Sequence, residues 1–197
     1  MNNLIKQLEK NGYEVKFFER AADVREALLN EISVDKSIGI GGSMTIQSIG
    51  IYEELLNRGN KVYWHWKAEN KKETSELAKN ADVYLTSSNA ITMDGKLVNM
   101  DGTGNRVSSM IFGHEKVYFV IGKNKICKNY EEAKIRIETI AAPKNAERLK
   151  LNTPCRFTGR CNDCDSKDRM CNVEVVLRKK PNGSNISIYL VNEDLGY

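Results

Sequence analysis

A dense group of polar side chains and glycines lies between residues 86 and 106, in the run TSSNAITMDGKLVNMDGTGNR. Such a mixture can donate and accept hydrogen bonds with a small polar molecule, and glycines let the backbone approach a ligand closely. We therefore predict a ligand site, with Asp101 as a candidate general acid or base and Arg106 as the partner of an anionic group. The candidate binding residues of this segment are Asn89, Thr92, Asn99, Gly102, Thr103, Gly104 and Asn105.

Two structural explanations compete with this prediction. Asp94-Gly95 is a frequent two-residue turn between hairpin strands. Asp101 can also serve as the cap of a helix expected over residues 103–112. The residues alone leave both explanations open.

A second group of candidates lies in the run GIGGSMT, residues 39–45, between a predicted strand and a predicted helix. Backbone N–H groups at such a turn can bind a phosphate, a carboxylate or a coenzyme pyrophosphate. The run is neither a Walker A loop nor a GxGxxG motif, and capping of the helix by Ser43 is the alternative. The predicted anion-binding residues are Gly41, Gly42, Ser43, Met44 and Thr45.

A third group consists of four cysteines within 17 residues near the end of the chain. In a chain expected to be cytoplasmic, such spacing favours metal or redox chemistry over disulfides. A four-thiolate zinc site and an iron–sulfur cluster are the two metal alternatives, and thiols without a metal are the third. The candidate ligands are Cys155, Cys161, Cys164 and Cys171.

Composition indicates a soluble globular protein of 197 residues, with 41% hydrophobic and 28% charged residues. The net charge of +4 is mild; it permits anionic metabolites and does not indicate nucleic acid. No apolar run approaches the roughly 20 residues that span a bilayer, and no signal peptide is recognisable. We therefore expect a cytoplasmic protein with neither a membrane nor a nucleic-acid partner, and oligomer formation stays open.

Short apolar runs alternate with amphipathic ones along the chain. Strands are expected over residues 13–17, 37–41, 61–66, 82–85 and 116–122, and helices over 22–32, 45–58, 70–80, 103–112 and 130–149, the last kinked near Pro143. This alternation predicts an α/β fold with a mostly parallel open sheet and flanking helices. The run KVYWHW (61–66) reads as a strand buried on both faces.

The tail has a different character. Residues 151–170 read as a cysteine-rich loop, and strands at 173–178 and 186–191 flank a turn, which predicts a hairpin. We therefore expect one domain over residues 1–197, with residues 151–197 as an appendage within it. Because ligands collect beyond the carboxyl ends of parallel strands, the runs at 41–45 and 86–106 are expected to share one pocket.

Three runs, GIGGSMT (39–45), TSSNAITMDGKLVNMDGTGNR (86–106) and KVYFVIGKNKI (116–126), resemble the lactate-utilisation (LUD) domain family. The run CRFTGRCNDCDSKDRMCN (155–172) resembles the cysteine-bearing tail of one subgroup, except that Ser166-Lys167 stands where the family often has Ser-Pro. The resemblance covers nearly the whole chain. It implies a fold like that of ribose-5-phosphate isomerase, glucosamine-6-phosphate deaminase and the coenzyme A transferases, which bind phosphate or coenzyme A at a turn corresponding to Gly41–Thr45.

The same resemblance implies a function. Some members act with iron–sulfur partners in the oxidation of L-lactate to pyruvate, so we expect a small anionic metabolite, an iron–sulfur protein partner and an accessory role in such a complex. The chain lacks ferredoxin-type cysteine runs and an equivalent of the catalytic glutamate of the coenzyme A transferases. The alternatives are a stand-alone enzyme acting on a sugar phosphate, a folate or a coenzyme A thioester, and a non-catalytic metabolite sensor.

Overall fold

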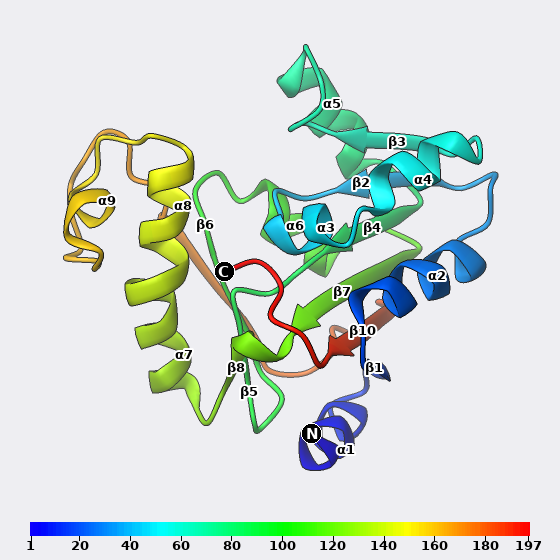
Figure 1. Ribbon diagram of the computed structural model, residues 1–197, viewed down its shortest axis with the longest axis horizontal. Coiled ribbons are helices and arrows are strands. Elements are labelled where there is room, and N and C mark those ends of the chain that lie inside the picture. Colours follow the sequence, from blue (N-terminus) through cyan, green and yellow to red (C-terminus); the bar gives the residue numbers. More distant parts are fainter.

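The computed structural model describes residues 1–197 and is built around a six-stranded sheet in which every strand is parallel to its neighbours (Figure 1). In spatial order the strands are β1 (Glu14–Phe18), β10 (Ile186–Val191), β7 (Lys116–Gly122), β4 (Val83–Thr86), β2 (Ser37–Ile40) and β3 (Lys61–Trp64). The predicted α/β class and mostly parallel sheet are confirmed.

The central strands are buried on both faces, so their side chains alternate between two hydrophobic clusters. In β7, Tyr118 and Val120 join the cluster on one face, and Val117, Phe119 and Ile121 join the cluster on the other. β10 follows the same alternation, and all six of its residues are buried. Continuous apolar runs of this kind are what a doubly covered parallel sheet requires.

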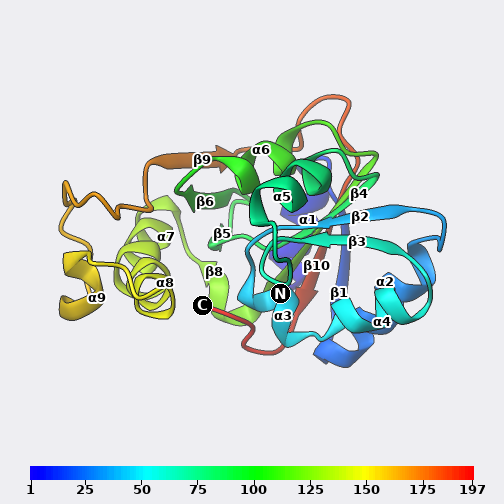
Figure 2. The same ribbon diagram turned by 90° about the horizontal axis from the view of Figure 1, so that it is seen from above.

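Helices cover both faces of this sheet (Figure 2). The first cluster contains residues from α2 (Ala21–Glu31), α3 (Met44–Ser48) and α4 (Ile51–Asn57). The second contains residues from α1 (Asn2–Lys10) and α6 (Asn105–Ile111), while α5 (Lys71–Lys79) packs on β2, β3 and α6.

A second, smaller sheet lies beside the first and joins the second cluster (Figure 2). Its strands, in order, are β8 (Ile126–Cys127), β5 (Ala90–Thr92), β6 (Leu97–Asp101) and β9 (Val173–Leu177). β5 and β6 form the hairpin expected at Asp94-Gly95, and Gly95 adopts the left-handed φ of 78° that this turn requires.

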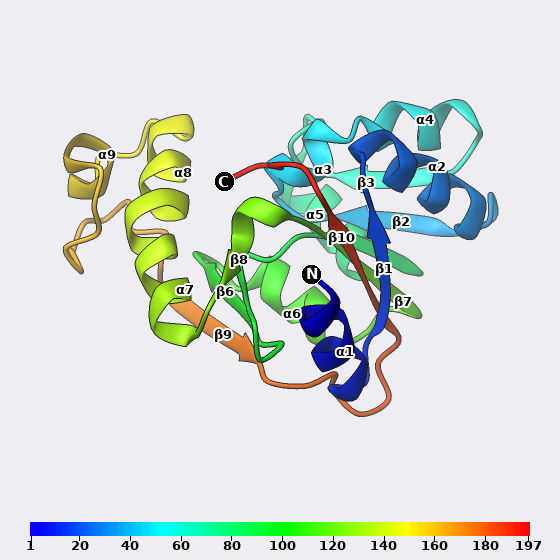
Figure 3. The ribbon, with the colours of Figure 1, turned by 60° about the horizontal axis from the view of Figure 1, so that its bottom comes forward.

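A long helical segment stands at one side of the molecule (Figure 3). It comprises α7 (Tyr130–Arg136), a π-helical turn (Ile137–Ala141) and α8 (Ala142–Arg148). The expected interruption near Pro143 is therefore present. Proline has no N–H to donate to the carbonyl four residues earlier in a helix, and its ring clashes with that carbonyl. The short helix α9 (Pro154–Thr158) packs against α8.

Three local predictions were wrong. β9 and β10 do not form a hairpin: β9 pairs with β6 in the small sheet, and β10 lies between β1 and β7 in the main sheet. The turn between them is present, with Gly183 at a φ of 77°, but complete burial suits β10 to a central position. β3 is an edge strand instead of one buried on both faces. The helix predicted over 45–58 is divided at Gly50, whose φ is 66°.

None of the helices combines the length and the apolar character that crossing a bilayer would need.

Candidate functional site

A cavity of about 290 Å³ lies where the carboxyl ends of the parallel strands meet the α7–α8 segment. Residues that follow five strands line it: Gly42 after β2, Trp66 after β3, Ser87 after β4, Lys125 after β7 and Tyr197 after β10. Figures 1 and 3 show the C-terminal segment running between the main sheet and α8. The parallel direction of the strands thus gathers residues from distant parts of the sequence.

The two segments singled out in the sequence both reach this cavity. The residues that line it are Gly42, Ser43, Met44, Asn89, Asp101, Gly102, Thr103, Asn105 and Arg106, together with Cys171 of the tail. The candidates outside its lining are Gly41, Thr45, Thr92, Asn99, Gly104, Cys155, Cys161 and Cys164. Thr92 lies in the β5–β6 turn, where its hydroxyl accepts a hydrogen bond from Lys96 N at 3.0 Å.

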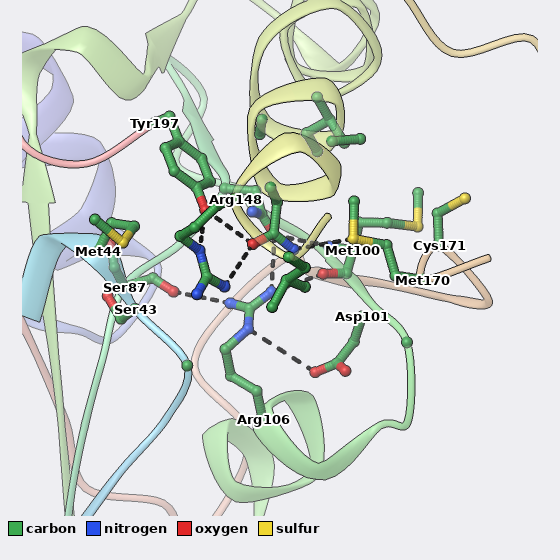
Figure 4. A pocket seen from close by; sticks show the side chains of 18 of the residues that line it. Ser43, Met44, Ser87, Met100, Asp101, Arg106, Arg148, Met170, Cys171 and Tyr197 are labelled. Atoms are coloured by element: carbon green, nitrogen blue, oxygen red, sulfur yellow. Dashed lines mark hydrogen bonds and ion pairs between the residues drawn. The ribbon is translucent and has the colours of Figure 1, made fainter. Parts of the chain in front are cut away.

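Arg106 holds several loops in place (Figure 4). Its Nη1 donates to Ser87 O at 3.0 Å and to Asn99 Oδ1 at 3.1 Å. Its Nη2 donates to Asn89 Oδ1 and to Met100 O, both at 2.8 Å. Every N–H of its two terminal nitrogens is therefore engaged within the protein, which supports a positioning role in place of the direct anion contact that the sequence predicts.

Asp101 caps helix α6. Its Oδ1 accepts from Thr103 N at 3.2 Å and Gly104 N at 3.1 Å, and its Oδ2 accepts from Val107 N at 3.2 Å. Its Oδ2 also lies 3.8 Å from Arg106 Nε. These contacts support the capping alternative, because backbone N–H groups at the start of α6 already occupy both carboxylate oxygens.

Lys125 is the most unusual ionisable group of the cavity. Only 3% of it is exposed, and its Nζ donates to Thr45 Oγ1 at 2.8 Å and to Ser87 Oγ at 3.0 Å. Its polar partners are hydroxyls, and none is a carboxylate. A buried ammonium without a counter-ion is costly, so such a lysine loses its proton or attracts an anion.

Other cations near Lys125 strengthen this effect. Burial lowers the pKa of Lys125 well below its usual range, and the nearby guanidinium groups of Arg136 and Arg106 lower it further. Arg136 is itself buried and donates to Asn124 O at 2.9 Å and Asn89 O at 2.6 Å. This edge of the sheet is therefore rich in positive charge, with Asp101 as the carboxylate of the cavity wall.

Arg148 approaches the same cavity from α8 (Figure 4). Its Nε donates to Tyr197 Oη at 2.9 Å and its Nη2 to Asn145 Oδ1 at 2.8 Å. Its guanidinium carbon lies 4.2 Å from the ring centre of Trp66, a favourable cation–π distance. Unlike Arg106, Arg148 is exposed and keeps Nη1 free for an anionic ligand.

The cysteine tail lies beside α8 and reaches the cavity through Cys171. Burial raises the pKa of the Cys171 thiol; the Arg169 cation opposes this shift, and the other three cysteines of the tail add to it. Arg169 Nη1 also donates to Cys164 O at 2.8 Å. No group of three or more histidine, cysteine, aspartate or glutamate side chains is arranged to hold a metal ion.

Several residues of the cavity were not predicted from the sequence. Lys125 follows the strongest buried strand, and position after a central parallel strand is a signal that could have identified it. Ser87 lay within the polar run but was not singled out. Arg148 and Tyr197 give no local signal, because only the folded chain places them against the sheet. His65, in the run 61–66 that reads as a buried strand, instead lines the cavity beyond the end of β3.

We predict that Arg106→Lys destabilises the protein by about 3 kcal/mol, since one ammonium cannot replace a fork that binds four acceptors. Urea unfolding measures this loss, and hydrogen exchange should show weaker protection over residues 87–103. Arg160→Lys, at an exposed position outside the cavity, is the matched control. An Arg106→Lys protein as stable as the wild type would refute the positioning role.

Comparison with known proteins agrees with this architecture. A family model described as the LUD domain matches residues 1–191. A DUF162 family protein from Deinococcus radiodurans has a similar solved structure, with a TM-score of 0.56 and 12% sequence identity over 96% of this chain and 94% of that chain. At this identity the likeness is one of fold. No curated protein matches the chain. From the match to the family model over nearly its whole length, the chain belongs to the LUD domain family.

Proposed function

We propose that the protein binds a small anionic metabolite in the cavity at the carboxyl edge of the main sheet. The observation that carries this proposal is the buried Lys125, whose amine has hydroxyl partners only. An anion in the cavity would supply the missing opposite charge. Arg148, which keeps one nitrogen free, offers a second contact from the facing wall.

The size of the cavity favours a small ligand. Its volume of about 290 Å³ is at the lower end of the range for small-molecule sites. A carboxylate of a few carbon atoms suits this volume better than a folate or a coenzyme A thioester. Because the LUD family is linked to lactate utilisation, we favour a hydroxy- or oxo-carboxylate of that size.

The predicted anion site at Gly41–Thr45 contributes to the cavity wall and to the hydrogen bonding of Lys125. Gly42, Ser43 and Met44 line the cavity, whereas Thr45 lies behind it and accepts the hydrogen bond from Lys125. The Ser43 hydroxyl accepts from Ile46 N at 3.2 Å and so caps α3. We therefore assign the anion chiefly to Lys125 and Arg148.

Within this proposal, an accessory role in the oxidation of a hydroxy-acid remains our preferred cellular function. It requires an iron–sulfur protein partner, because the chain lacks ferredoxin-type cysteine runs. A metal held by Cys155, Cys161, Cys164 and Cys171, either zinc or an iron–sulfur cluster, would require these side chains to move closer together.

We predict that L-lactate, pyruvate or inorganic phosphate raises the melting temperature of the protein, because a ligand that binds only the native state stabilises it. Lys125→Met should weaken this binding at least about tenfold, or about 1.4 kcal/mol. Lys123→Met, at an exposed position in the same short helical turn, should bind like the wild type.

Thermal-shift measurements followed by calorimetry provide the test. A Lys125→Met protein that is folded and binds as tightly as the wild type would refute the proposed site. The absence of binding for every ligand of this panel would count against the ligand class.

We predict that protein purified without oxygen carries one metal site that depends on the cysteine tail. The double variant Cys161→Ser/Cys164→Ser should lose the metal, and Cys127→Ser, outside the tail, should keep it. Elemental and sulfide analysis distinguishes zinc from an iron–sulfur cluster. A wild-type protein free of metal, with the same protease resistance over residues 151–172 with and without a chelator, would refute the metal site.

A further inference from the structure

The two hydroxyl partners of Lys125 differ in their other hydrogen bonds. Thr45 Oγ1 lies 3.1 Å from Leu195 O, to which its hydroxyl donates. Thr45 therefore accepts a hydrogen bond from Lys125 Nζ at 2.8 Å. The remaining close partner of the amine is Ser87 Oγ at 3.0 Å, whose own contact with Ser88 O is longer, at 3.4 Å. A proton can thus pass between Lys125 and Ser87.

The surroundings of Lys125 suit a neutral, reactive amine. The side chain lines the cavity, so a ligand can reach it, although only 3% is exposed. The cations Arg136 and Arg106 act on it, and both disfavour a protonated amine. Desolvation and an adjacent cation are the two means by which proteins make a lysine nucleophilic at neutral pH.

We propose that Lys125 is a nucleophile that forms an imine with a small aldehyde or ketone carrying an anionic group. This inference rests on the proposed function, because the anionic group would be held by the cationic wall that includes Arg148. It adds a covalent step and a reactive carbonyl to that function. An oxo-acid with its carboxylate and a triose with its phosphate both fit this description, because each joins a reactive carbonyl to an anionic group.

Imine formation moves two protons from the nitrogen to the carbonyl oxygen. The Nζ lone pair attacks the carbonyl carbon, the N–C bond forms, and the carbonyl oxygen becomes a hydroxyl by taking a proton. The nitrogen gives up a proton, for which Ser87 Oγ at 3.0 Å is the relay, because the Thr45 hydroxyl donates to Leu195 O. The carbinolamine nitrogen then gives up its second proton, the hydroxyl takes a proton and leaves as water with the C–O electron pair, and the nitrogen lone pair forms the C=N bond. The amine and the carbonyl compound thus yield an imine and water without any oxidant or reductant.

Reductive trapping tests the inference on the full chain. Pyruvate and sodium cyanoborohydride are added at neutral pH, and peptide mapping by mass spectrometry locates the adduct. We expect labelling of Lys125 to exceed that of Lys123 by at least about tenfold, because each unit of pKa depression gives about ten times more neutral amine. This comparison lies within one protein and does not depend on the folding of a variant.

Further trapping experiments test which carbonyl compounds react and whether Ser87 relays the proton. Dihydroxyacetone phosphate replaces pyruvate to distinguish phosphate from carboxylate, and acetone tests the need for an anionic group. Labelling of Lys125 by either anionic carbonyl in excess of acetone supports the proposal, and equal labelling by acetone contradicts it. Ser87→Ala should slow adduct formation roughly 100-fold, the usual size of a lost proton-transfer group.

The possible failures are distinguishable. Binding of pyruvate or phosphate without any adduct on Lys125 would overturn the imine and leave the anion site intact. Equal labelling of Lys125 and the exposed lysines would also overturn it. If neither ligand bound nor an adduct formed, both the imine and the proposed function would fall.

Discussion

All six strands of the main sheet run in the same direction, and this constraint gathers functional side chains from distant parts of the sequence at one edge. Five strands end at one edge and deliver residues 42, 66, 87, 125 and 197 to a single cavity. Helices cover both faces of the sheet, so this edge is the place where polar groups can meet without disturbing the core. The π-helical turn before Pro143 belongs to the segment that closes the cavity from the outside.

Two arginines at the cavity have different tasks because their hydrogen bonds differ. The terminal nitrogens of Arg106 are saturated by protein acceptors. Arg106 therefore contributes positive charge to the cavity, but its terminal nitrogens have no free N–H group for a ligand. Arg148 is anchored by Tyr197 and Asn145 on two nitrogens and keeps the third free. Lys125 is a buried amine with Arg106 and Arg136 as cationic neighbours, so losing its proton and binding an anion are two ways to avoid an uncompensated buried charge.

The general architecture followed from the sequence because apolar runs and helical spacing recur at every element of the α/β alternation. The C-terminal strands were misplaced because a turn at Pro181-Asn182-Gly183-Ser184 predicts local pairing, whereas the complete burial of β10 depends on neighbours far away in the sequence. The polar run at 86–106 was found from its composition. Its division into a clamp at Arg106 and a cap at Asp101 depends on which donors and acceptors meet in the fold, and local patterns do not contain that information. Lys125 was overlooked because one lysine in a lysine-rich run differs from its neighbours only in burial.

The measurement that tests this account most directly is the pKa of the Lys125 amine, followed by nuclear magnetic resonance of its Nζ and Cε atoms with and without inorganic phosphate. We expect the empty protein to titrate well below the usual lysine range, and phosphate to raise this pKa because an opposite charge favours the protonated form. Phosphate should then bind more weakly as the pH rises through the raised value, since the anion binds the protonated amine more tightly. An ordinary lysine pKa that phosphate does not change would contradict the account.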